Sequence, residues 1–398
     1  MAGLSRSGRN LCGWMRASGP CSSNSVRITF MNAPVKVSGR WWRLLRAGCV
    51  STGLASGGVV RGRRCRKRTR WEAGLVCFCL LVTLVARADN NRVQTLQLQQ
   101  GWNSVFLEVA PANPDPKQVF LNTPVDIVAM FFPAAGSVEF VQNPGTINWN
   151  KDGWGVWYAP RRSDAFLSSL YQIQGRRAYL IHAEQSCTFS VQGPASLEAL
   201  RWKSDSFNHV GFSLDPQSPP TFDKFFAGSA AHRNGRIFRL VNDKWTQVLN
   251  PITTFMRSGE AYWVYCKGGS DYQGPLSVRP DIGDGLAFLN QTTQGLTFAN
   301  NSPDPMVVSV QIPEGTLPLK YAVRALSPGQ LQDLAIDLPS FYQMATLEPG
   351  GTAALRLQVR LESLTHSVQS TVLRISTDGG VVFWVPAAAC RRDLLTPP

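Results

Sequence analysis

The chain has 398 residues, enough for two or three domains, and a hydrophobic content of 44%, which excludes a wholly disordered protein. Its formal net charge of +14 would ordinarily favour a nucleic-acid or membrane partner. However, residues 1–88 hold sixteen of the 40 basic residues and a single acid, Glu72. The remainder carries 24 basic and 25 acidic residues, so no nucleic-acid partner is predicted.

Residues 61–88 have the three parts of a secretory signal in the right order. A basic block (61–70) precedes a short apolar run (73–85), and Ala86-Arg87-Ala88 supplies the small-x-small exit. We therefore predict cleavage between Ala88 and Asp89 and a secreted or cell-surface protein. The alternative is an anchor formed by the uncleaved segment, although the run is shorter than the roughly 20 residues of a span. Membrane contact is expected through this segment alone.

Residues 1–60 are rich in Gly, Ser and Arg and have no sustained hydrophobic period. Two interpretations stay open for them. They are a disordered leader of unknown purpose, or Met1 is a mis-assigned start and translation begins near Val59 or Val60.

Two stretches, 89–195 and 196–280, share five short motifs in the same order, which predicts two copies of one β-module. The pairs are Trp102-Asn103 and Phe207-Asn208, Pro111 and Pro216, Asp152-Gly153-Trp154 and Asp243-Lys244-Trp245, Ala178-Tyr179 and Ala261-Tyr262, and Gln192-Gly193-Pro194 and Gln273-Gly274-Pro275.

A short helix is predicted after the early proline of each copy. In the first copy Asp115 can cap a helix that begins at Pro116, and in the second Thr221 can cap residues 222–226. Most other segments of the two copies have strand composition, separated by Asn, Gly and Pro. These strands are expected over 125–132, 138–142, 236–241 and 262–265.

The Gly101-Trp102-Asn103 opening and the late strand at residues 259–264 (Gly-Glu-Ala-Tyr-Trp-Val) resemble the "GWN" β-modules of exported bacterial surface proteins. The resemblance covers about residues 95–280. It implies a surface location and no defined chemistry. The second copy has Phe207 where the pattern has Trp, so it departs from the family there.

Residues 281–398 are predicted to form a β-sandwich. Apolar and polar residues alternate from Leu355 to Glu362, and Asp378-Gly379-Gly380 separates two strands as a hairpin turn. The segments 296–302, 347–350 and 373–378 resemble immunoglobulin-like domains of the hydin and major-sperm-protein group, which implies a spacer or interaction domain. The whole chain is therefore expected to be all-β with a few short helices.

Three cysteines follow the signal, an odd number that fits no zinc motif. A disulfide between Cys187 and Cys266 is one possibility in an oxidising compartment, and three free thiols are the other; the role of Cys390 stays open.

Asn148, Asn150 and Asp152 before Gly153 imitate the first half of a calcium loop, but the charge is low and a simple turn is the alternative. No cofactor motif is present, so none is predicted.

Aromatic residues crowd one stretch beside asparagine and aspartate. They are Trp149, Trp154, Trp157 and Tyr158. Flat rings beside polar groups suit a sugar-binding platform, and the alternative is that they belong to the core. Two or more coplanar, exposed indoles would favour the platform over the alternative that these rings belong to the core.

The four histidines form no metal or catalytic motif, so the chain is not predicted to be an enzyme. The leading hypothesis is a secreted or cell-surface structural or adhesive protein with an unknown surface protein or glycan as its partner. A carbohydrate-binding surface protein and an extracytoplasmic hydrolase with an unrecognised site are the alternatives.

Overall fold

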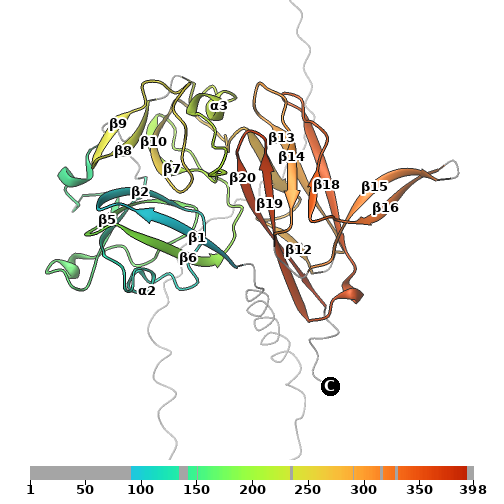
Figure 1. Cartoon of the computed structure of the whole chain (residues 1–398), viewed down its shortest axis with the longest axis horizontal. Helices are drawn as coiled ribbons and strands as arrows, with labels where there is room; N and C mark the ends of the chain where they lie inside the picture. The colour runs from blue at the N-terminus through green and yellow to red at the C-terminus, as the bar shows by residue number, and fades with distance from the viewer. Residues whose placement is uncertain are drawn as a thin grey trace, which may run out of the picture. The chain divides into compact units, whose positions relative to one another are not determined.

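The computed structural model describes residues 91–133, 142–149, 151–233, 236–289, 291–313, 317–327 and 330–391, with the backbone alone for 324–327 and 330–333. All of the described residues belong to one compact unit. The described residues form twenty strands and two short α-helices, so the expected all-β class is confirmed (Figure 1).

The first four-stranded sheet has the order β2-β5-β3-β4. Its strands are β2 (Gly101–Leu107), β5 (Arg177–Ala183), β3 (Val125–Phe131) and β4 (Trp154–Tyr158). A two-stranded sheet of β1 (Asn91–Leu98) and β6 (Cys187–Pro194) supplies further core residues. Because buried Leu96 and Leu98 alternate with exposed residues, β1 has one dry face that packs in this core.

The second four-stranded sheet repeats the same order with different strands, as β7-β10-β8-β9. They are β7 (Ser206–Gly211), β10 (Ala261–Cys266), β8 (Ile237–Val241) and β9 (Lys244–Gln247). Both predicted helices are present, as α2 (Pro116–Val119) and α3 (Phe222–Phe226). Asp115 accepts a hydrogen bond from Lys117 N and Thr221 accepts one from Lys224 N, as the caps predicted.

The tyrosines of the shared Ala-Tyr motif, one in β5 and one in β10, make the same contact in both sheets. Tyr179 Oη accepts from Gln174 N at 2.7 Å, and Tyr262 Oη accepts from Arg257 N, also at 2.7 Å. In each case the tyrosine holds the backbone five residues before it. Each tyrosine therefore holds in place the segment of chain that leads into its strand, β5 or β10.

Asparagines at the same position of β2 and β7 act in the same way. Asn103 Oδ1 accepts from Gln99 N at 2.9 Å, and Asn208 Oδ1 accepts from Lys203 N at 2.8 Å. The Nδ2 groups of both asparagines donate to the carbonyl two residues earlier, at 3.0 Å in each copy. The motifs shared in the sequence are thus the residues that shape the turn before each first strand.

We expect Tyr179→Phe and Tyr262→Phe each to lower the free energy of unfolding by about 1–2 kcal/mol, because each leaves a backbone N–H without its acceptor. Urea denaturation measures the loss. Tyr171→Phe is the matched control, since Tyr171 is 75% exposed. Equal stabilities for all three variants would contradict this role of the tyrosines.

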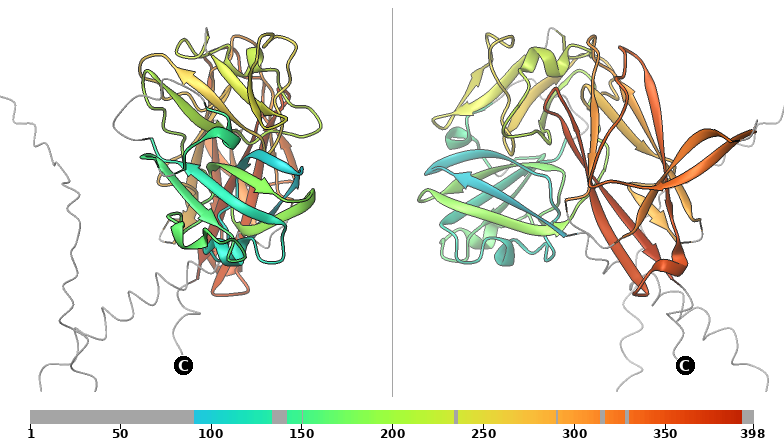
Figure 2. Two further views of the ribbon diagram at one scale, coloured as in Figure 1. Left: turned by 90° about the vertical axis from the view of Figure 1, so that its left-hand side faces the viewer. Right: turned by 45° about the vertical axis from the view of Figure 1, so that its right-hand side comes forward.

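Two five-stranded sheets pack against each other as a β-sandwich, seen in orange and red in Figure 1 and Figure 2. One has the order β11 (Leu276–Pro280), β13 (Thr293–Asn300), β18 (Thr352–Val359), β15 (Leu319–Ser327), β16 (Gln330–Asp337). The other has the order β12 (Leu286–Phe288), β20 (Val382–Cys390), β19 (Val368–Thr377), β14 (Val308–Gln311), β17 (Phe341–Gln343). The predicted hairpin at 378–380 joins β19 to β20, and Gly380 has a φ of 76° that suits the turn.

The second module and the sandwich share strands and core. β11 follows the motif Gln273-Gly274-Pro275 yet pairs with β13 of the sandwich. One hydrophobic cluster contains buried residues from Leu197 to Ala389. The two parts therefore have no separate cores, and the limits 89–195, 196–280 and 281–398 stay predictions. The strand expected at 138–142 falls almost wholly on residues 134–141, which lie outside the described residues.

Candidate functional site

The two four-stranded sheets meet through the same face of each. Ser104 and His209 both follow the shared asparagine, and Ser104 Oγ lies 2.9 Å from His209 Nε2. Ser104 Oγ also donates to Ala261 O at 2.8 Å, and Phe106 N donates to Gly259 O at 2.8 Å. Equivalent residues of the two copies thus contact each other, as in an isologous interface.

An aromatic cluster fills the rest of this contact. Trp263 lies with its ring centroid 6.3 Å from that of Trp154 and 6.2 Å from that of Trp245. Trp149 contacts Trp154 at 5.2 Å and Trp102 at 5.2 Å. All but the tilted Trp102–Trp149 pair are edge-to-face, and aromatic pairs of this kind stabilise beyond the area they bury, by about 0.5–1.5 kcal/mol each. The cluster therefore joins the two sheets.

These contacts correct the sugar-platform prediction. Trp157 is 5% exposed and stacks on Phe120 inside the first core, and Tyr158 is 9% exposed in a second hydrophobic cluster, because both faces of the edge strand β4 are covered. Trp149 and Trp154 are half-buried, and their rings meet at 85°. Since a platform needs coplanar, exposed rings, the four residues do not form one.

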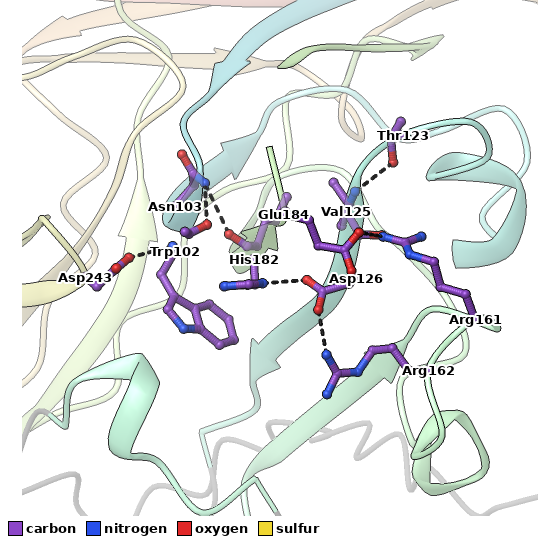
Figure 3. A network of polar contacts seen from close by, with 12 residues as sticks. Trp102, Asn103, Thr123, Val125, Asp126, Arg161, Arg162, His182, Glu184 and Asp243 are labelled. Atoms are coloured by element: carbon purple, nitrogen blue, oxygen red, sulfur yellow. Dashed lines mark hydrogen bonds and ion pairs between the residues drawn. The ribbon is translucent and has the colours of Figure 1, made fainter. Parts of the chain in front are cut away.

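A polar network lies beside the aromatic cluster (Figure 3). Asp126 is buried, and its Oδ1 lies 2.5 Å from His182 Nδ1 while its Oδ2 accepts from Arg162 Nη1 at 2.6 Å. Arg162 is also held by Asp164, whose carboxylate, with that of Asp126, raises the pKa of the guanidinium. The His182 ring lies 5.1 Å from that of Trp102.

This arrangement can orient an imidazole, as a buried carboxylate does in general-base catalysis. Catalysis by a nucleophile would also need a hydroxyl or thiol within reach of the ring. Within the described ranges, His182 makes its polar contact with Asp126 and is hydrogen-bonded to no serine, threonine or cysteine. The network therefore fixes the end of β5 and the 161–164 turn. Sequence reasoning missed it, although a carboxylate within the apolar run of β3 was a usable signal.

A groove of about 1100 Å³ opens between β1, the turn that joins β8 to β9, the turn before β10, and β20. Charged and aromatic side chains line it, among them Arg92, Trp102, Glu108, Arg239, Glu260 and Trp384. Its volume is at the upper end of ordinary ligand sites.

The charged groups of the groove are mostly paired with one another. Arg92 Nη1 lies 2.5 Å from Glu108 Oε2, and the Arg92 guanidinium stacks 4.0 Å from the ring centre of Trp384. Arg239 Nη2 lies 2.8 Å from Glu260 Oε2. A carboxylate held by arginine is fixed in place and can still accept hydrogen bonds, so it can bind donor groups of a ligand.

The residues predicted for calcium binding and for signal cleavage lie partly outside the described part of the chain. Asn150 is outside the residues that the structure describes, and Asp152 is exposed in the turn before β4. No group of three or more His, Cys, Asp or Glu suited to a metal occurs in the described part of the chain. Ala88 and Asp89, the predicted cleavage site, also lie outside it. Among the described residues no helix is long and apolar enough to span a membrane.

Of the two possibilities for Cys187 and Cys266, the disulfide is not formed. Cys187 and Cys266 are both free thiols in the structure. Cys187 begins β6 opposite Leu98, whereas Cys266 ends β10 and its Sγ donates to Gly268 O at 3.3 Å. The two thiols belong to different sheets, and burial raises the pKa of each.

No family model matches this chain. No curated protein matches it either. Solved structures with similar parts include an ASH/PapD-like domain (PapD-like domain 7) of human CEP192, with a TM-score of 0.19 and 8% identity over 29% of this chain and 84% of that one. A FixG-related protein from Vibrio parahaemolyticus has a TM-score of 0.18 and 12% identity over 29% of this chain and 94% of that one.

The collagen-binding domain of the Erysipelothrix rhusiopathiae surface protein RspB has a TM-score of 0.15 and 9% identity, covering 76% of this chain and 86% of that chain. At these TM-scores the likenesses add nothing to the description of the fold.

Proposed function

We propose that this chain is an exported surface protein that binds a partner in the groove beside β1, in a structural or adhesive role and not a catalytic one. The proposal includes two modules of the GWN type followed by an immunoglobulin-like sandwich. The equal strand order of the two four-stranded sheets and their matching tyrosine contacts support it.

The groove is the observation that carries the proposal. Its walls come from both modules and from the sandwich, and these parts are tied together by backbone hydrogen bonds. Asp215 N donates to Gly380 O at 2.9 Å and Val382 N donates to Ser213 O at 3.1 Å. A site built on joined sheets keeps its shape under load, which is what an adhesive or structural protein requires.

Export is tested through the signal segment, which lies outside the groove. In a bacterial host we expect the wild-type chain to reach the medium or the cell surface with a first residue near Asp89. Leu80→Arg, which places a charge in the apolar run, should block this export, and Leu80→Ile should not. Amino-terminal sequencing of each cell fraction gives the readout. An intact chain in the cytosol of wild-type cells would contradict the proposal.

A further inference from the structure

Strand β1 is an edge strand with little of the usual protection. In the described residues it pairs with β6 alone, over eight continuous register pairs from Asn91 to Leu98 without a bulge. It contains no proline and no lysine, the residues that commonly block an exposed edge, and its charged residue Arg92 is paired with Glu108. Residues 92–100 all line the groove, so the groove runs along this edge.

The register shows which backbone groups of β1 face the groove. Gln192 O accepts from Ala112 N at 3.1 Å, so the backbone groups of Gln192 point away from β1. Its partner Val93 is therefore in a non-hydrogen-bonded pair, and the alternation continues at Thr95 and Gln97. In such pairs the N–H and C=O groups of both residues point outward.

Side-chain contacts agree with this assignment. Residues of non-hydrogen-bonded pairs lie closer together, so their side chains meet. Thr95 Oγ1 lies 3.1 Å from Ser190 Oγ, and Thr188 Oγ1 donates to Gln97 Oε1 at 2.9 Å. These are the pairs Thr95–Ser190 and Gln97–Thr188 of the register.

No hydrogen bond between described residues reaches the backbone N–H or C=O groups of Val93, Thr95 and Gln97 from outside β6. The neighbouring edge of β2 is closed in contrast. Asp243 Oδ1 accepts from Trp102 N at 2.6 Å, and Gln94 Oε1 accepts from Glu108 N at 2.8 Å. The chain thus caps one edge of the groove with side chains and leaves the other open.

The open groups repeat every second residue, or about every 7 Å. A polypeptide in extended conformation offers donors and acceptors at the same spacing, whereas a glycan does not. The groove also holds one exposed cation, Arg257, that has no acidic partner among the described residues, whereas its acids Glu108 and Glu260 are paired with arginines. Charge complementarity therefore favours an acidic residue in the occupant.

We propose that the groove binds an extended acidic segment of another polypeptide, which adds to β1 as a third strand and pairs with Val93, Thr95 and Gln97. This partner class rests on the binding role proposed above. Backbone hydrogen bonds would give the affinity and Arg257 part of the specificity.

A library of random linear peptides displayed on phage, panned on the purified full chain, provides the probe. One enriched peptide is then synthesised with a fluorophore, and its affinity is measured by fluorescence anisotropy.

We expect Thr95→Pro to weaken peptide binding at least about tenfold, because proline removes an outward N–H and leaves the ladder with β6 intact. Thr95→Val, which keeps the N–H, should bind the peptide like the wild type. Arg257→Ser should weaken binding of acidic peptides and reduce its salt dependence.

A second measurement does not depend on any variant. Amide hydrogen exchange in the wild-type chain should slow at Val93, Thr95 and Gln97 when the peptide is added. The proposal is overturned if no linear peptide is enriched, if a folded Thr95→Pro chain binds equally well, or if exchange at these three amides is unchanged. It is also overturned if a glycan array identifies a ligand that displaces the peptide without protecting them. Because the assay uses purified chain, a failure of export leaves its outcome unaffected.

Discussion

Alanine at Gly211 is expected to lower the free energy of unfolding by about 2 kcal/mol or more, and valine by a larger amount. Gly211 ends β7 on the face that meets the first sheet. A Cβ there would lie 2.2 Å from Phe106 Cβ and 2.4 Å from its Cγ. Phe106 is 4% exposed and packs with Ala178 and Ala261, so its ring has no space to move into.

Urea denaturation measures this loss, and Gly145→Ala is the matched control. A Cβ at Gly145 meets nothing within 4 Å, so that variant should stay within about 0.5 kcal/mol of the wild type. Combining Gly211→Ala with Phe106→Ala should cost less than the sum of the two single losses, because the smaller side chain removes the clash. Additive losses in the double variant would show that the two sheets do not meet at these residues.

The folded chain is expected to lose stability as the pH falls below about 6.5, the pKa of histidine in an unfolded chain. Burial lowers the pKa of His209 to about 3 and that of His232 to about 4. His209 Nδ1 and His232 Nε2 are buried and have no hydrogen-bond partner among the described residues, which accords with neutral rings.

The direction follows from which state binds the proton. A lowered folded pKa means that the unfolded chain takes up protons first, so stability is complete above pH 6.5 and falls toward the folded pKa values. Each histidine contributes a loss of up to about 1.4 kcal/mol per pH unit in this window. Together they can remove as much as about 4 kcal/mol between pH 6.5 and 5.

Denaturation curves at about pH 7.5 and pH 5 measure the loss, and a chain with both His209→Asn and His232→Gln should show little of it. His366→Gln is the control, since His366 is exposed. An equal loss in the double variant and the wild type would assign the acid sensitivity to other groups.

Local signals predicted the elements well. The caps at Asp115 and Thr221 gave both helices, and Asp378-Gly379-Gly380 gave the hairpin between β19 and β20. These signals work because a cap or a turn satisfies its hydrogen bonds within a few residues. The prediction of an exposed aromatic platform was wrong for Trp157 and Tyr158, which are both buried. The local sequence pattern does not reveal whether a sheet is covered on one face or on both.

The sequence alone determined the strand class and the helix caps, since each is recorded in neighbouring residues, and its recurring motifs predicted the equal strand order of the two four-stranded sheets. The tertiary structure alone decided that Ser104 meets His209, that Asp126 meets His182, and that Arg92 stacks on Trp384. These partners come from separate strands, and Arg92 and Trp384 from opposite ends of the described chain. Alternation fixes which side chains point inward, but the choice of the opposing sheet depends on packing between distant segments.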